Sequence, residues 1–212
     1  HTALILQKEG FIMTIFYKVR NNLYVNLTNR CPCACTFCLR QTRDHMENSG
    51  SLWLDHEPSF EEVLNDLKNF RLSDYNEVVF CGFGEPTEAL DILLETARYI
   101  KSIFSNPIRI NTNGLGNLIN GRDIAPLLSG LIDTVSISLN TPDARSYHQL
   151  VRSRFGDISF QAMLDFAKEC TKYVPNVVMT TVDTTISKEE EAQCGRICEQ
   201  LGVTYRIRPW ED

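Results

Sequence analysis

Three cysteines lie close together in the run CPCACTFC, with three residues between Cys31 and Cys35 and two between Cys35 and Cys38. No regular helix or strand brings three sulfurs with this spacing to one point, whereas a loop wrapped around an inorganic cluster does. Cubane iron–sulfur clusters normally take four protein thiolates. With three ligands from this loop, one iron would stay open to a small molecule, as a catalytic zinc keeps a free position. The spacing therefore predicts a [4Fe–4S] cluster with one reactive corner.

Two other uses of these thiols remain open at this point. Zinc prefers four donors, usually in two separated pairs, and this run contains one compact group. Cys33 would be a strained fourth donor, because only one residue separates it from Cys31 and one from Cys35. Disulfides are also conceivable. A cluster without further chemistry would indicate an iron–sulfur electron carrier, and a zinc ion would indicate an interaction module.

A second motif, GFGEP at residues 82–86, follows the short apolar segment 77–81. Its two glycines allow the backbone to approach a ligand closely and to adopt φ angles that other residues avoid. The Glu-Pro step ends the strand and directs one carboxylate over the edge of the sheet. Ordinary strand-to-helix turns use the same residue types, so the position of this run, one β–α unit after the cysteine loop, gives it weight.

Together the two runs resemble the radical S-adenosylmethionine (SAM) superfamily, whose signature is CxxxCxxC after the first strand and a GGEP-like motif after the second. Phe83 stands where that motif usually has its second glycine. The chain also resembles a narrower group, the TatD-associated radical SAM proteins. The stretches NLYVNLTNRCP, SLWL, EVVFCGFGEPTE, INTNG and VSISLN carry this likeness.

The resemblance implies a role for each matching position. Cys31, Cys35 and Cys38 would hold the [4Fe–4S] cluster, and SAM would chelate its open iron. The positions implied to contact SAM are Phe37 at the adenine, Gly84 and Glu85 at the methionine amino group, Ser138 at the ribose or carboxylate, and Asn113 as a polar lining residue. A 5′-deoxyadenosyl radical would abstract hydrogen from a small-molecule or peptide substrate, so no side chain is assigned as catalytic. An electron donor such as flavodoxin or ferredoxin is implied.

The composition is typical of a soluble globular protein, with 43% hydrophobic and 23% charged residues among 212. No apolar stretch approaches the roughly 18 residues that span a bilayer. Eight cysteines without a secretion signal indicate a reducing compartment, and we expect the cytoplasm. The net charge of −6 argues against nucleic acid as a partner. Two arginine pairs are candidates for holding an anionic substrate group: Arg152 with Arg154, and Arg206 with Arg208.

Strand and helix patterns alternate from Met13 onward, which predicts a parallel sheet covered by helices. Residues 1–12 are interpreted as a tag, a linker or an upstream remnant, and residues 13–212 as one core domain. Six strands fall short of the eight of a full barrel, so the fold class is α/β, a partial (β/α)6 TIM-type barrel. The expected strands are 22–28, 77–81, 108–112, 134–139, 176–182 and 203–208. The expected helices are 59–70, 87–104, 124–128, 143–150, 159–173 and 188–201.

Overall fold

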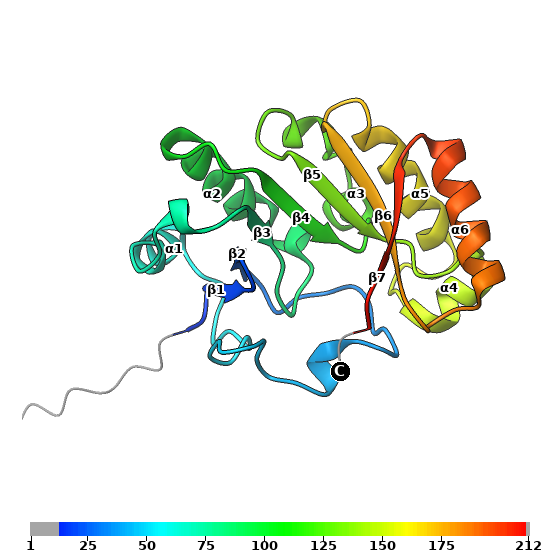
Figure 1. The fold of residues 1–212 in the computed structure, drawn as a ribbon, viewed down its shortest axis with the longest axis horizontal. Coiled ribbons are helices and arrows are strands. Elements are labelled where there is room, and N and C mark those ends of the chain that lie inside the picture. The colour runs from blue at the N-terminus through cyan, green and yellow to red at the C-terminus, as the bar shows by residue number, and fades with distance from the viewer. Residues whose placement is uncertain (1–12, 211–212) are drawn as a thin grey trace, which may run out of the picture.

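The computed structural model describes residues 13–210, which form one seven-stranded sheet with its strands in chain order (Figure 1). The first two strands, β1 (Phe16–Val19) and β2 (Asn22–Val25), pair antiparallel, and every later neighbour pairs in parallel. The other strands are β3 (Val78–Phe80), β4 (Ile108–Thr112), β5 (Thr134–Ser138), β6 (Asn176–Val182) and β7 (Thr204–Arg208).

The prediction of an open barrel with six parallel strands is confirmed by β2 to β7. Strand β1 was not predicted from the sequence. It folds back onto β2 through a tight turn in which Arg20 has a φ of 53°, a left-handed conformation. The hairpin extends the sheet beyond its first parallel strand.

The helices follow the predicted pattern, with three corrections. The short helix α3, Gly116–Asn120, was not predicted. The segment predicted as one helix over 87–104 begins as a 3-10 turn, Pro86–Ala89, before α2, and the segment 124–128 is a 3-10 turn, Ala125–Leu128. Pro86 sits at the first position of its turn, where its missing N–H is not needed. The α-helices are α1 (Phe60–Leu67), α2 (Leu90–Ile103), α3 (Gly116–Asn120), α4 (Ala144–Val151), α5 (Ile158–Cys170) and α6 (Lys188–Leu201). None of the helices in the described part of the chain has the length and hydropathy needed to cross a membrane.

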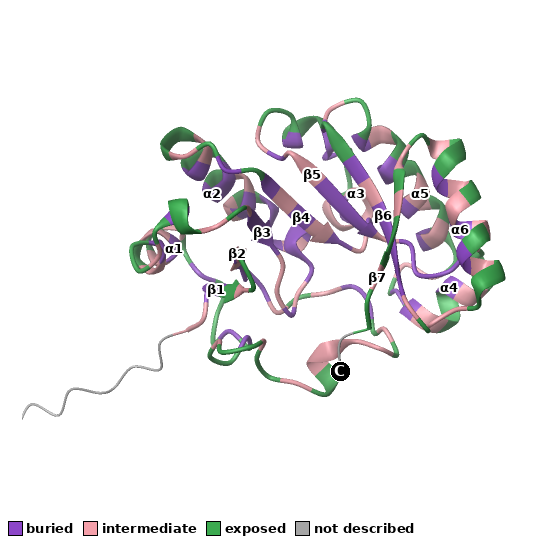
Figure 2. Ribbon diagram, in the orientation of Figure 1, coloured by how far each residue is buried: buried purple, intermediate pink, exposed green. Residues whose placement is uncertain are grey.

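The two faces of the sheet differ in polarity. Along β4, Ile108 and Ile110 are buried in the core that packs against the helices, whereas Arg109 and Asn111 alternate with them and are partly exposed. Buried residues accordingly concentrate in the central strands and on the helix surfaces that face them (Figure 2). Because the helices supply the hydrophobic packing on one side, the opposite face of the sheet is free to carry polar groups.

Candidate cluster and cofactor site

The cysteine loop follows β2 and is anchored by the chain at the end of α4. The backbone N–H groups of Ala34 and Thr36 donate to the carbonyls of Val151 and Leu150, at 3.1 and 3.0 Å. An isolated bridge also pairs Cys33 with the segment that follows α4. The loop therefore receives its conformation from a segment far away in the sequence. In Figure 1 it lies at the lower side of the molecule, where β7 also ends.

The structure gathers the thiols of Cys31, Cys33 and Cys35. Cys33 is buried in the core between the two others, which are partly exposed, as is Cys38. Hydrogen bonding with the Cys33 thiol lowers the pKa of Cys31 and of Cys35, although burial acts in the opposite direction. Burial raises the pKa of Cys38. The placement of Cys33 as a packed thiol beside two candidate ligands is the feature that the spacing alone did not reveal.

Within residues 13–210, no three His, Cys, Asp or Glu side chains converge as the ligands of one metal ion must. A cubane presents its iron atoms at separate corners, so its thiolate ligands gather around the cluster but lie further apart than the ligands of a single ion. One buried polar atom near the cysteines supports room for a bound group. The Tyr147 hydroxyl is buried and has no hydrogen-bond partner in the described chain. Unpaired buried polar atoms are uncommon and call for an explanation.

Tyr147, which carries this unsatisfied hydroxyl, lies near the cysteines. Its side chain is 1% exposed. Burial, followed by the nearby sulfurs of Cys33 and Cys35, raises the pKa of Tyr147. The phenol is thus a neutral donor near the cysteine sulfurs, and it has no acceptor among the described residues. A soft thiolate set with a neutral O–H donor beside it fits a [4Fe–4S] cluster, whose properties depend on hydrogen bonds to its sulfurs.

The GFGEP loop packs directly against the residues that lead into the cysteine loop. The backbone N–H of Glu85 donates to the carbonyl of Arg30 at 2.8 Å. A Cβ atom added to Gly84 would lie 2.1 Å from the carbonyl oxygen of Thr28, which is far inside van der Waals contact. Glycine at position 84 is therefore required by close approach of two backbones, and this approach places the two motifs side by side.

The Glu85 side chain is buried, with 4% exposure, and is held by residues of two elements. Its Oε1 accepts from the Thr112 hydroxyl at 2.6 Å and from the Thr87 hydroxyl at 2.7 Å, and its Oε2 accepts from the Asn113 backbone N–H at 2.7 Å. Burial raises the pKa of the Glu85 carboxyl, although these hydrogen bonds act in the opposite direction. The carboxylate ties the loop after β3 to the end of β4, and Oε2 retains capacity for a further donor.

The remaining predicted site residues lie at the ends of neighbouring strands. The Asn113 amide lies 3.6 Å from the Cys33 sulfur, so Asn113 contacts both motifs. Ser138 ends β5 and is partly exposed, in register with Thr180 of β6. Phe37 is partly exposed within the cysteine loop. Glu85 and Asn113 are brought into contact with each other, and Asn113 reaches the cysteine loop at Cys33. Among the described residues, no hydrogen bond joins Cys38, Ser138 or Phe37 to the side chains of Glu85 and Asn113.

Phe83, which replaces the second glycine of the motif, packs away from the candidate site. It is buried in a small cluster with Tyr17 and Leu52. The ring of Trp53 meets it edge-on, with the centroids 5.1 Å apart. Phe83 thus holds the segment of Leu52 and Trp53, which follows the cysteine loop, against the protein. The close backbone approach at Gly84 is unaffected by this substitution.

A salt-bridge network that the sequence did not suggest holds the loop at both ends. The buried carboxylate of Glu88 lies 3.2 Å from Arg30 and 3.3 Å from Arg154. Arg154 also stacks on Phe155, with its guanidinium carbon 4.9 Å from the ring centroid. Arg154 is therefore already engaged within the protein, and the prediction that it holds a substrate anion together with Arg152 is not supported by its contacts.

Known proteins that resemble this chain belong to the radical SAM superfamily. The sequence model of the radical SAM superfamily matches residues 25–196. A GTP 3′,8-cyclase from Corynebacterium glutamicum is 33% identical over 166 residues, which cover 72% of this chain and 40% of that enzyme. A GTP 3′,8-cyclase 2 from Mycobacterium bovis is 29% identical over 211 residues, which cover 96% of this chain and 54% of the relative. The chain thus spans about half the length of these curated relatives, or less.

A solved structure shows the same fold. SuiB from Streptococcus suis, in its complex with S-adenosylmethionine, aligns with a TM-score of 0.59 and 21% identity, over 89% of this chain and 38% of SuiB. Members of the superfamily use a [4Fe–4S] cluster together with SAM. The two motifs, their order on the sheet and the extent of the family match lead to one conclusion: the chain belongs to the radical SAM superfamily.

Proposed function

We propose that this chain is the core of a radical SAM enzyme, with Cys31, Cys35 and Cys38 as the ligands of the [4Fe–4S] cluster. The observation that carries the proposal is the direct contact between the two motifs at one edge of the sheet, through the 2.8 Å hydrogen bond from Glu85 to Arg30. When bound, the cluster and SAM supply a 5′-deoxyadenosyl radical that abstracts hydrogen from the substrate.

The protein's own contribution would be to bind and orient these groups. The backbone at Gly84 lies closely against the chain before the cysteines, which leaves the Glu85 Oε2 to accept the methionine ammonium of SAM as a charge-assisted hydrogen bond. Ser138 and Asn113 would line the same space with polar groups, and Phe37 would lie against the adenine. A carboxylate that is already fixed by three residues loses little freedom on binding a ligand.

The substrate is proposed to be a small molecule or a peptide. GTP is the substrate named for the matched cyclases, and SuiB has been crystallised with a precursor peptide. We also propose flavodoxin or ferredoxin as the electron donor. Residues 13–212 are proposed to form one core domain. Within the superfamily, we propose that the chain belongs with the TatD-associated radical SAM proteins. The eight free cysteines support a reducing compartment, for which we propose the cytoplasm.

Anaerobic reconstitution with iron and sulfide tests this function. We expect about four iron atoms per chain, and release of 5′-deoxyadenosine from SAM after addition of a strong reductant. Glu85→Gln should weaken SAM binding while the iron content is retained, because the amide removes the charge but keeps the shape. Zinc in place of iron would support the interaction module, and iron without SAM cleavage would support the electron carrier.

A further inference from the structure

The polar face of the sheet collects three arginines from two strands. Tyr205 of β7 hydrogen-bonds to Thr181 at 2.7 Å and packs against the core. Successive residues of a strand point to opposite faces, so Arg206 and Arg208 point to the other face. Arg109 of β4 lies on that same face, and the charges of Arg109 and Arg208 both act on Arg206.

Only one of these three cations is neutralised within the described chain. Arg109 lies 2.7 Å from Glu77 and 2.7 Å from the Asn111 side chain. None of the ion pairs formed within residues 13–210 involves Arg206 or Arg208. The Nε of Arg208 is buried and finds no acceptor among those residues. A buried guanidinium donor without a partner is unfavourable, so we expect an acceptor atom of a bound ligand to hydrogen-bond to it.

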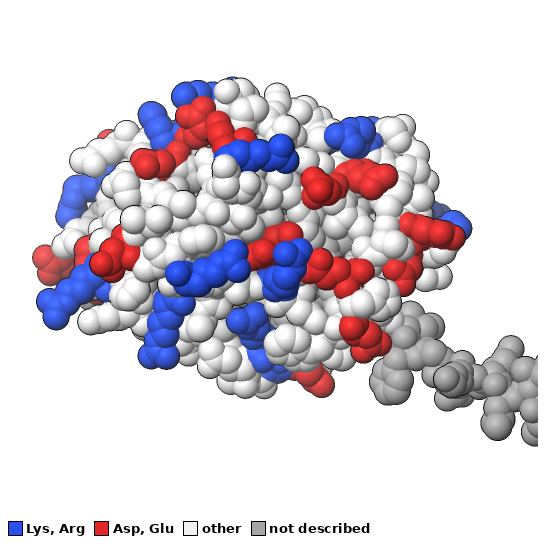
Figure 3. All heavy atoms as spheres, turned by 180° about the vertical axis from the view of Figure 1, so that it is seen from behind, with Lys and Arg blue, Asp and Glu red and all other residues white. Residues whose placement is uncertain are grey.

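The surroundings favour an anion at this place. Partial burial, and after it the nearby positive charges of Arg109 and Arg208, lower the pKa of Arg206. Glu77, the acidic group that acts on Arg206, is paired with Arg109. Asp183, whose backbone N–H donates to the carbonyl of Arg208, is paired with Lys188. On the face behind the view of Figure 1, by contrast, acidic and basic side chains are intermixed (Figure 3).

The register of the strands relates these arginines to the proposed SAM position. Arg206 pairs with Thr180, and Thr180 pairs with Ser138. Neighbouring strands are about 4.8 Å apart, so Arg206 lies about 10 Å from Ser138 across the sheet. This separation suits a small molecule whose reactive carbon meets the SAM-derived radical while a charged group is held further along the sheet.

We propose that Arg206 and Arg208 form the binding site for an anionic group of the substrate, a phosphate or a carboxylate. This inference rests on the proposed radical SAM function, and it narrows the substrate to an anionic small molecule. The planar guanidinium groups match both anions in bidentate geometry. Arg109, fixed by Glu77, stands behind them as a further positive charge.

Calorimetric titration of the reconstituted protein, with SAM present, tests the site with two probes, inorganic pyrophosphate and glutarate. We expect at least one probe to bind, and its Kd to rise about tenfold or more in Arg206→Gln and in Arg208→Gln. Arg208→Lys should restore part of the affinity, because it keeps the charge and loses the fork. Arg196→Gln on exposed α6 removes the same charge elsewhere and should leave the Kd unchanged. The tighter probe identifies the anion class.

Three results would overturn the inference: neither probe binds, the Arg196 variant loses as much affinity as the others, or the β7 variants weaken SAM and not the probes. The last result would assign the arginines to SAM itself. Release of 5′-deoxyadenosine in the absence of substrate, measured on the same preparation, distinguishes failure of the anion site from failure of the proposed radical SAM function. If SAM is cleaved but the anion site fails, the radical SAM function stands alone. If cleavage is absent, the proposed function itself fails.

Discussion

At the scale of single residues, the cysteines differ in what surrounds them. Cys33 is buried in the core, while Cys31, Cys35 and Cys38 remain partly exposed. A partly exposed thiol can bind one of the iron atoms of a cluster that also faces the SAM site, whereas a packed thiol behaves as a small apolar side chain. The placement of Cys33 beside two candidate ligands makes it the most informative control for the ligand assignment.

Replacing Cys35 by alanine should abolish the cluster, whereas Cys33→Ala should retain it. The first change removes one of three ligands, and the second removes a buried sulfur at a cost of about 1 kcal/mol in the free energy of unfolding. Iron content and the visible absorption of the reconstituted proteins distinguish the two. Equal loss of iron in both variants would mean that the wrong thiols have been assigned.

The unpaired hydroxyl of Tyr147 leads to a second prediction. Tyr147→Phe removes a buried polar atom that has no partner in residues 13–210, so the cluster-free protein should become more stable by about 1 kcal/mol. If the bound cluster accepts from the phenol, this gain should disappear in the reconstituted protein. Urea unfolding of both forms under anaerobic conditions measures the difference. A destabilised cluster-free variant would show that the hydroxyl is already satisfied.

At the scale of elements, two backbone segments meet at Gly84. The loop after β3 and the end of the segment from β2 approach so closely that no Cβ fits between them. This contact aligns the GFGEP motif with the cysteine loop, and the Glu88 network with Arg30 and Arg154 holds it from the other side. The geometry of the site therefore depends on backbone packing as much as on the side chains that would bind ligands.

Gly84→Ala should destabilise the protein strongly and reduce SAM affinity, because the new Cβ would overlap the Thr28 carbonyl. Gly195→Ala is the matched control. Gly195 lies within α6 with its nearest neighbour 3.6 Å from the added carbon, so alanine should stabilise the helix by about 0.5–1 kcal/mol. Thermal unfolding measures both changes. Similar melting temperatures for the two variants would contradict the close approach.

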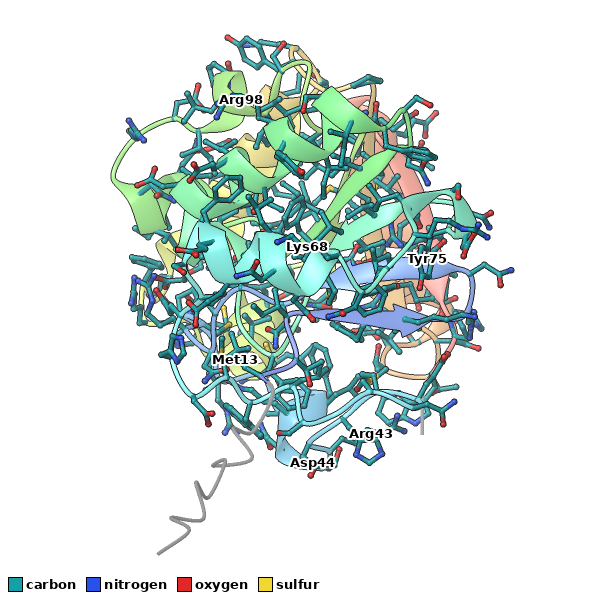
Figure 4. All side chains as sticks on the ribbon, turned by 90° about the vertical axis from the view of Figure 1, so that its left-hand side faces the viewer. Met13, Arg43, Asp44, Lys68, Tyr75 and Arg98 are labelled. Atoms are coloured by element: carbon teal, nitrogen blue, oxygen red, sulfur yellow. The ribbon has the colours of Figure 1, made fainter. Side chains whose placement is uncertain are left out.

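At the scale of the whole molecule, the cysteine loop packs on the helix-covered core through Cys33, and the chain after it extends to one end of the molecule. Arg43 and Asp44, which follow the cysteines, lie at one end of the molecule, and Arg98 of α2 lies toward the other (Figure 4). The loop is tied to the rest chiefly through backbone hydrogen bonds to the segment after α4 and through the contacts of the GFGEP loop. Binding of a cluster should therefore order this part preferentially.

Removal of iron with a chelator should raise amide hydrogen exchange in residues 31–55 and leave β3 to β6 protected. The core strands keep their hydrogen bonds and apolar packing without the cluster, whereas the loop loses its central group. Exchange measured by mass spectrometry on the loaded and chelated protein tests this. A uniform rise over the whole sheet would mean that the cluster supports the global fold.

Much of this architecture was predictable from short sequence patterns. The alternation of strand and helix signals predicted six parallel strands, and the predicted helix start at residue 59 agrees with α1, whose N-cap is Ser59. Strand β1 was missed because four residues joined to β2 by a tight turn carry little periodic signal. The 3-10 turn before α2 was read as helix because Pro86 and its neighbours suit both conformations.

The candidate site was also predictable from the sequence only in part. The spacing of the cysteines and the GFGEP run indicated radical SAM chemistry. Both signals are local, because the residues that bind one cluster or one ligand group must lie at fixed short distances along the chain. Only the tertiary structure decided that Glu85 is fixed by β4, that Arg154 is occupied by Glu88, and that Arg206 and Arg208 form no ion pair within residues 13–210. Such contacts join residues that are distant in the sequence, and their partners are selected by packing and burial, which no local pattern records.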